Sequence, residues 1–131
     1  MFVDASAMCA ILLNENGSDL LVAKLAGSSS AATSPIAVFE TVRALMREAQ
    51  IEPGEARRKM ARFLVAARIE PAEIGPAERE VALDAMAKFG KGRHPARLNM
   101  GDCFAYACAR TRGAQLLFKG DDFSRTDIEA A

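Results

Sequence analysis

The sequence predicts an α/β fold with three α/β/α layers, in which helices cover both faces of a central, mainly parallel sheet of four or five strands. Short apolar runs alternate with longer amphipathic segments along the chain, a pattern that favours βαβ units. Glycine and proline stand at the segment boundaries, as they do at helix ends. Acidic residues directly follow the first and the last core strand, at the edge where parallel sheets bind ligands.

Length and composition favour one compact domain spanning residues 1–131. A chain of 131 residues, half of them hydrophobic, can bury a core without disulfides or metal staples. Lys plus Arg and Asp plus Glu number 17 each, so the net charge points to no partner. The three cysteines form neither a CxxC pair nor an even set, which suits a reducing cytoplasm. No apolar run approaches the ~20 residues that span a bilayer, and the first residues lack the positive start of a signal peptide, so we expect a cytoplasmic protein without a membrane partner.

The first half of the chain is expected to supply two strands and three helices. Ser34 is a good N-cap and Pro35 suits the first helical position, so a long helix should begin there. Its apolar stripe is Val38, Val42, Leu45 and Ala49, and Glu40 falls off that stripe. The preceding elements are a strand at Phe2–Val3, a helix at Ala7–Leu13 with Ser6 near its start, a helix at Asp19–Leu25 closed by Gly27, and a weak strand at Ala31–Thr33.

The second half repeats the alternation of helices and strands. Met100–Arg112 reads as a helix that ends at Gly113, and Gln115–Phe118 reads as a strand. The other expected elements are a basic helix opening at Pro53–Gly54, a strand at Ile69–Ile74, a helix from Gly75–Pro76 to Phe89 with Gly90 as its stop, a loop at Lys91–Asn99, and an edge strand at Thr126–Ile128.

Asp4 and Asp102 are the acids whose positions suggest chemistry. Asp4 ends the first strand and precedes an apolar helix, so its carboxylate should be partly buried. Asp102 stands in the first turn of a helix, where capping alone would also explain an acid. Glu40 reads by default as an exposed helical glutamate. The pair Asp121–Asp122 follows the last core strand and therefore lies at the same edge of the sheet as Asp4.

Several carboxylates that meet need a counter-charge. Two unit charges ~4 Å apart repel by roughly 4 kcal/mol at an effective dielectric near 20, so such a cluster takes up protons or binds a cation. Oxygen ligands select Mg²⁺ or Mn²⁺ over zinc. One or two such cations could activate water for attack on a phosphodiester.

The basic segments fit a nucleic-acid substrate. Lys91, Arg93 and Arg97 lie in a stretch without acids directly before Asp102, where they could guide a phosphate backbone to the acids. The alternative for this stretch is a solvated loop. With no tryptophan and one tyrosine, no base-stacking platform is evident, so binding should depend on backbone and shape. A second basic patch comprises Arg57, Arg58, Lys59 and Arg62.

Other chemistries lack their residues. No glycine motif matches a P-loop or a dinucleotide fingerprint. His94 is the only histidine, which weakens a Ser-His or Cys-His mechanism. A phosphoacceptor receiver domain would need two adjacent acids after the first strand, but Ala5 follows Asp4.

At these residues the chain resembles the PIN-domain ribonucleases, and specifically the VapC toxins of bacterial type II toxin–antitoxin pairs. The resemblance covers essentially the whole chain. It rests on Val3–Ala7, on Glu40, and on the carboxy-terminal blocks Phe89–Tyr106, Leu116–Phe123 and Thr126–Ile128.

The resemblance implies a PIN-like fold and roles for individual residues. Asp4, Glu40 and Asp102 match the acids that bind Mg²⁺ or Mn²⁺ and position the attacking water, and Ser6 matches the hydroxyl residue that helps hold the first acid. The fourth acid is Asp122 or Asp121, with Asp122 favoured because it directly precedes a phenylalanine. Many relatives have Thr or Ser before this acid, whereas this chain has Lys119–Gly120.

The resemblance further implies partners. A cognate VapB-type antitoxin would lie in a groove of the toxin, a homodimer would align two active sites, and RNA would be the substrate, with transfer RNA as one class. The alternative hypothesis is a PIN-like protein- or RNA-binding module that keeps the fold without the chemistry.

Overall fold

A parallel sheet of four strands forms the centre of the molecule. The computed structural model describes residues 1–131, and its strands follow the order β3-β2-β1-β4 with every pairing parallel. The fold class predicted from the alternation of segments is therefore confirmed. The strands are short: β1 Phe2–Val3, β2 Ala31–Thr33, β3 Ile69–Pro71 and β4 Leu116–Leu117.

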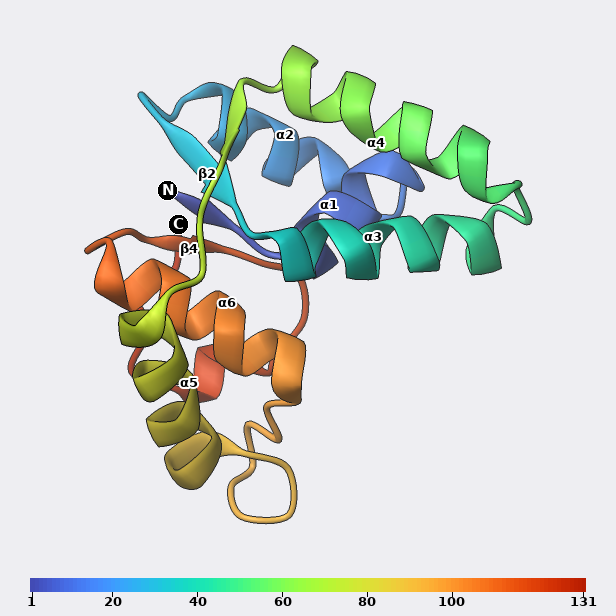
Figure 1. The fold of residues 1–131 in the computed structure, drawn as a ribbon. Helices are drawn as coiled ribbons and strands as arrows, with labels where there is room; N and C mark the ends of the chain where they lie inside the picture. Colours follow the sequence, from blue (N-terminus) through green and yellow to red (C-terminus); the bar gives the residue numbers. More distant parts are fainter.

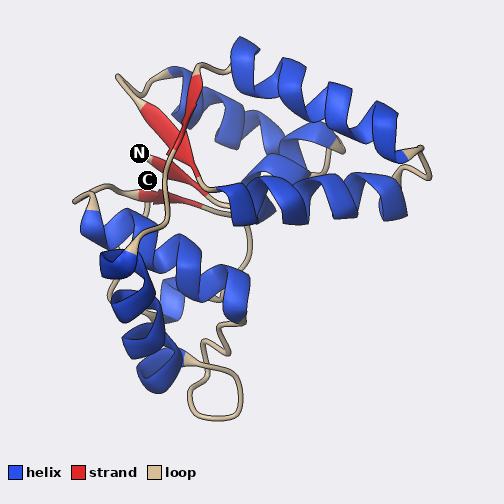
Figure 2. Cartoon of the chain, viewed as in Figure 1, coloured by secondary structure: helices blue, strands red, loops and turns tan.

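Helices cover both faces of this sheet (Figures 1 and 2). Four helices lie on one face: α1 Ala5–Leu12, α2 Ser18–Ala26, α3 Pro35–Glu48 and α4 Pro53–Ala66. The other face carries α5 Pro76–Phe89, α6 Met100–Thr111 and the short 3-10 helix η1 Phe123–Arg125. None of these helices combines the length and apolarity needed to cross a lipid bilayer.

Alternation along two-residue strands divides the core into two halves. Phe2 and Leu116 pack with α5 and α6, whereas their neighbours Val3 and Leu117 pack with α1 to α4. All four side chains are at most 1% exposed. Because successive strand residues point to opposite faces, even strands this short anchor both helical layers.

Several elements differ from the sequence-based expectation: the last core strand is shorter, at Leu116–Leu117 instead of Gln115–Phe118, and three other differences have a local cause. Helix α1 begins at Ala5 because Asp4, and not Ser6, caps it. Strand β3 ends at Pro71, and by Gly75 the chain has turned into the cap of α5, where the Gly75 N–H donates to Glu78. Thr126–Ile128 forms no strand, because the Thr126 hydroxyl donates to the Phe123 carbonyl and accepts from the Ile128 N–H.

The sheet edge next to β4 is occupied instead by the carboxy-terminal residues. Ala130 forms an isolated parallel bridge with Leu116, and the Leu116 N–H donates to the Glu129 carbonyl. The termini therefore both lie beside the sheet (Figure 1).

Helix α3 positions Glu40 and starts as the sequence predicts. The Ser34 hydroxyl accepts a hydrogen bond of 3.2 Å from the Ala37 N–H, and Pro35 follows at the first helical position. The most buried residues are Ala37, Thr41 and Leu45, while Val38 and Val42 of the predicted stripe are half-buried. This rotation brings Glu40 to a half-buried position instead of the exposed one expected by default.

Replacing Ser34 by alanine should lower the free energy of unfolding by about 1 kcal/mol, because a buried cap bond is lost. Glu52→Ala is the matched control, since Glu52 caps α4 without a side-chain hydrogen bond and should cost less than about 0.5 kcal/mol. Urea denaturation of both variants measures the difference. Equal losses would mean that the Ser34 cap does not stabilise α3.

Candidate active site

Asp4 occupies the carboxyl end of the central strand β1 and is 3% exposed. The backbone N–H of Ser6 donates to Asp4 Oδ2 at 2.9 Å, and the Ser6 hydroxyl donates to the same oxygen at 2.6 Å. Burial raises the pKa of Asp4, against the lowering effect of these hydrogen bonds. Since both bonds end on Oδ2, Oδ1 is left for an external ligand.

Asp102 both caps helix α6 and belongs to the acidic site. Its Oδ2 accepts from the Asn99 N–H at 2.8 Å, and Asn99 Oδ1 accepts from the Asp102 N–H at 3.1 Å, which completes a capping box. Burial, together with the charges of Asp4, Asp122 and Glu40 and against the lowering effect of the Asn99 bond, raises the pKa of Asp102 to about 7. Asp102 therefore makes a capping bond and also feels the charges of the other acids, whereas the sequence offers capping as an alternative explanation for this residue.

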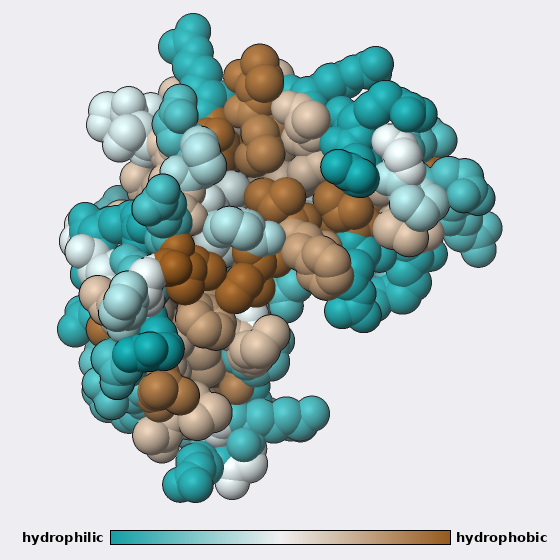
Figure 3. Space-filling model, in the orientation of Figure 1, coloured by the Kyte–Doolittle hydropathy of each residue, from teal (hydrophilic) through white to brown (hydrophobic).

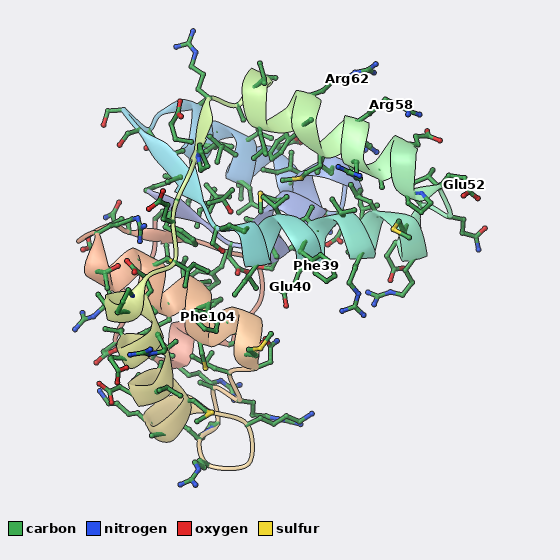
Figure 4. All side chains as sticks on the ribbon, in the orientation of Figure 1. Phe39, Glu40, Glu52, Arg58, Arg62 and Phe104 are labelled. Carbon is green, nitrogen blue, oxygen red and sulfur yellow. The ribbon has the colours of Figure 1, made fainter.

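Glu40 reaches the site across an interhelical contact. A β-carbon built onto Gly101, the second residue of α6, would lie 2.6 Å from Cδ of Glu40 and closer still to its two oxygens. The absence of a side chain at this position is therefore what allows α3 and α6 to bring their acids together. Burial and the charge of Asp4 raise the pKa of Glu40, while Arg43 lowers it. Figure 4 shows Glu40 on the side of α3 that faces α6.

The fourth acid that shares this electrostatic environment is Asp122. After burial, the charge of Asp122 is among the causes that raise the pKa values of Asp4 and Asp102. The charge of Asp121 is not among the causes of either shift, and its backbone carbonyl accepts from the Ser124 hydroxyl instead. Both aspartates are exposed. The charge of Asp122, and not that of Asp121, thus acts on Asp4 and Asp102.

A second bond of Ser6 ties the segment that carries Asp122 to Asp4. The Ser6 hydroxyl accepts from the Lys119 N–H at 3.0 Å while it donates to Asp4. The Lys119 side chain forms an ion pair with Glu15, and Gly120 turns the chain with a φ of 104°. This bond comes from the Lys119 backbone, so it needs no hydroxyl side chain at this position.

The basic residues predicted to bind a phosphate backbone lie on the loop between α5 and α6. Lys91, Arg93 and Arg97 are exposed, and none forms an ion pair. Backbone bonds close the base of the loop, from the Lys91 N–H to the Leu98 carbonyl at 3.1 Å and from the Leu98 N–H to the Phe89 carbonyl at 3.0 Å. The chain then enters α6 two residues before Asp102.

The second basic patch is not brought to the acids. Arg57, Arg58, Lys59 and Arg62 are exposed on α4. Figure 4 shows Arg58 and Arg62 on α4, away from the space between α3 and α6 where Glu40 lies.

The donor set fits a hard divalent cation. All four side chains supply carboxylate oxygens, and the raised pKa values of Asp4, Glu40 and Asp102 reflect burial and mutual repulsion that a cation would relieve. As the side chains stand, no three of the acidic, histidine or cysteine groups are gathered closely enough to chelate an ion. Rotation of the carboxylates toward a common centre would accompany binding, and such a centre could bind a phosphate oxygen.

Gly101 and Arg43 are the site residues that sequence reasoning missed. Gly101 stands inside the motif Asn99–Asp102, but its close approach to Glu40 depends on how two helices cross. Arg43 follows Glu40 by one helical turn, so helical periodicity could have indicated a cation beside that carboxylate.

The raised pKa of Asp102 predicts a stability gain for Asp102→Asn in metal-free buffer. A carboxyl whose folded pKa is about 7, above the reference value of 3.8, destabilises the fold when ionised, and this cost grows as pH rises from about 4 to 7. Asparagine keeps the acceptor for the Asn99 N–H. In EDTA at pH 8 we expect the free energy of unfolding to rise by about 1–3 kcal/mol, and at pH 4 it should hardly change. The rise stays below the free energy that corresponds to the whole pKa shift, because Asp102 is partly solvated.

Urea denaturation at the two pH values measures this gain. Asp121→Asn is the control, since Asp121 lies outside the charge cluster and should change stability by less than about 0.5 kcal/mol. A loss of stability for Asp102→Asn at pH 8 would contradict the repulsion argued above.

Comparison with known proteins agrees with this arrangement. The sequence profile of the PIN domain matches residues 1–129. A VapC ribonuclease of Rhizobium meliloti strain 1021 is 41% identical over 139 aligned positions, which cover 97% of this chain and 98% of the relative.

Two solved structures share the fold. VapC20 of Mycobacterium tuberculosis, described as a toxin that cleaves the sarcin-ricin loop, has a TM-score of 0.78 and 18% identity, covering 99% of this chain and 97% of that one. A toxin–antitoxin complex from Klebsiella pneumoniae has a TM-score of 0.68 and 14% identity, covering 96% and 92%. The profile and the relative that spans nearly the whole chain show that this protein belongs to the PIN-domain family, among its VapC ribonucleases.

Proposed function

We propose that this chain is the toxin of a type II toxin–antitoxin pair and an endoribonuclease that hydrolyses RNA phosphodiester bonds with Mg²⁺ or Mn²⁺. Residues 1–131 would act as one PIN domain. The observation that carries the proposal is the electrostatic coupling of four acids from four separate segments, Asp4, Glu40, Asp102 and Asp122. VapC ribonucleases of this family are generally metal-dependent.

Each acid takes a role from its position. Asp4 and Asp102, each with one oxygen fixed by capping bonds, are proposed as the principal metal ligands. Glu40, whose carboxylate is confined against Gly101, would add a metal ligand or orient the attacking water. Asp122 would be the remaining ligand, while Asp121 would stay in solvent. A bound divalent cation would lower the pKa of a ligand water and neutralise charge on the phosphate.

Supporting residues hold this geometry and the substrate. Ser6 would keep both Asp4 and the segment of Asp122 in place through its two hydrogen bonds. Lys91, Arg93 and Arg97 would bind phosphates of the RNA, since they are exposed cations without ion-pair partners on the loop that leads to Asp102. Transfer RNA is one class of substrate that this surface could serve.

Two protein partners complete the proposal. A VapB-type antitoxin would cover an apolar surface, and Leu20, which is 70% exposed on α2, is a suitable contact, whereas Leu21 of the same helix is core. A homodimer would place two active sites along one face. The competing hypothesis of a binding module without chemistry is tested by expression without antitoxin: growth arrest that Asp4→Ala abolishes supports the enzyme, and harmless expression supports the module.

Asparagine scanning should separate the two carboxy-terminal acids. Purified protein is expected to cleave cellular RNA with Mg²⁺ or Mn²⁺, and Asp102→Asn should abolish cleavage because a principal ligand loses its charge. Asp122→Asn should lower kcat at least about 100-fold, whereas Asp121→Asn should stay within about threefold of wild type. Single-turnover cleavage of labelled RNA measures all three. Full activity in a clean Asp102→Asn preparation would sink the assignment.

Gly101→Ala tests the contact that brings Glu40 into the site. The added methyl group would displace the Glu40 carboxylate, so Mn²⁺ affinity or kcat should fall about 10- to 100-fold. Shortening Glu40 to aspartate in the Gly101→Ala background should restore part of the loss, although Glu40→Asp alone should be harmful. Isothermal calorimetry with Mn²⁺ and cleavage rates measure both effects.

Gly54→Ala is the matched control, because Gly54 is likewise the second residue of a helix but meets only an arginine side chain at 3.5 Å. A neutral Gly101→Ala variant would mean that α3 can move aside without harm to the site.

A further inference from the structure

Phe39 is the one aromatic side chain that the fold leaves in solvent. The chain has seven phenylalanines, one tyrosine and no tryptophan, and every one except Phe39 is buried or half-buried. Phe39 is 63% exposed although it sits on a helix whose opposite side is packed in the core. An isolated exposed apolar residue needs no explanation, but this one directly precedes Glu40.

The contact between Glu40 and Gly101 brings the start of α6 close to the turn of α3 that carries Phe39. Phe39 precedes Glu40 on α3, and Met100, which is 68% exposed, precedes Gly101 at the start of α6. Both exposed residues therefore adjoin, along the chain, a residue of the contact between α3 and α6. Figure 4 shows Phe39 beside Glu40 on the side of α3 that faces α6, with Phe104 on α6. The space-filling view, in the orientation of Figure 1, shows apolar residues along the hollow between α3 and the pair of helices α5 and α6 (Figure 3).

Charges of opposite sign border Phe39. The carboxylates lie on one side of Phe39, and Arg43 follows it by four residues on the same face of α3. Arg43 is exposed, forms no ion pair, and lies close enough to Glu40 to lower its pKa against the larger effects of burial and Asp4. An aromatic face between a cation-binding cluster and a free guanidinium matches a nucleotide, whose base is flat and whose phosphate is anionic.

We propose that Phe39 forms a stacking face for one unpaired nucleobase next to the bond that the acids cleave. The inference rests on the proposed function and deepens it, because a base paired inside a duplex cannot leave its neighbours to stack on a protein ring. The substrate at the cleaved bond is therefore a loop or a single strand. From the sequence, with no tryptophan and one tyrosine, no stacking platform is evident.

A double perturbation of ring and base tests the proposal. The probe is a short labelled single-stranded RNA with a mapped cleavage site, in which nucleotides around the cleaved bond are replaced one at a time by abasic residues. Phe39→Leu should lower kcat/KM on the intact RNA on the order of 10- to 100-fold. One abasic substitution should cost the wild type a similar factor and should cost Phe39→Leu little more, because the stacking is already lost.

Three controls accompany this experiment. Phe39→Trp should keep kcat/KM near that of the wild type, because an indole also stacks. Val65→Ala should leave it unchanged, since Val65 is 81% exposed on α4, away from the acids. Annealing the RNA to its complement should suppress cleavage by the wild type.

Several results would overturn the proposal. The first is full activity of Phe39→Leu. The second is a loss of kcat/KM, relative to the wild type on the same RNA, that is as large on every abasic RNA as on the intact RNA. The third is dissociation of a dimer by Phe39→Leu in sedimentation velocity. The last result would assign Phe39 to a contact with a second copy of the chain.

Fluorescence of a 2-aminopurine RNA separates this inference from the proposed function. With Ca²⁺ in place of Mg²⁺, the wild type should quench the probe at one position and Phe39→Leu should not. Quenching in Ca²⁺ together with no cleavage in Mg²⁺ or Mn²⁺ would retain the stacking face and reject the nuclease. Cleavage that Phe39→Leu leaves unchanged would retain the nuclease and reject the stacking face.

Discussion

The burial of neighbouring carboxylates, which also repel one another, is the constraint on which the rest of this structure depends. Asp4, Glu40, Asp102 and Asp122 come from a strand end, two helices and the cap of a 3-10 helix, and burial together with their mutual charge makes at least three of them hard to ionise. Three of these acids are held by contacts that do not depend on the other acids. Ser6 does this for Asp4, and Asn99 does it for Asp102. Glu40 is confined instead by close packing against Gly101.

The sheet supplies the stability that this cluster opposes. Its strands have only two or three residues, yet Phe2, Val3, Leu116 and Leu117 are almost fully buried, two toward each helical layer. Since β1 is central and parallel to both its neighbours, its carboxyl end is covered on two sides, and the residue that follows it is buried whatever its polarity. The same burial that secures the core therefore raises the pKa of Asp4. Core stability and site chemistry share one cause here.

What the sequence could reveal follows from how local each signal is. The positions of Asp4 after a strand and of Asp102 in the first turn of a helix could be predicted because strand ends and helix starts are local patterns, and the α/β class followed from alternation along the chain. Glu40 could not be placed from periodicity, because its burial arises from a crossing of α3 and α6 that only the folded chain contains. The choice between Asp121 and Asp122 likewise depends on a turn at Gly120. Phe39 escaped notice because exposure, and not residue type, makes it unusual.

Capping explains why the two principal acids can serve structure and chemistry together. A carboxylate has two oxygens, and in both Asp4 and Asp102 the cap bonds end on Oδ2. The backbone thus fixes the direction of each carboxyl group, while the other oxygen remains able to bind a cation. Because the fixed oxygens lie at the starts of α1 and α6, the partial positive charge of two helix N-termini offsets part of the repulsion. A cation that bound the remaining oxygens would stabilise the folded chain further, so ion binding and folding are linked through the same four side chains.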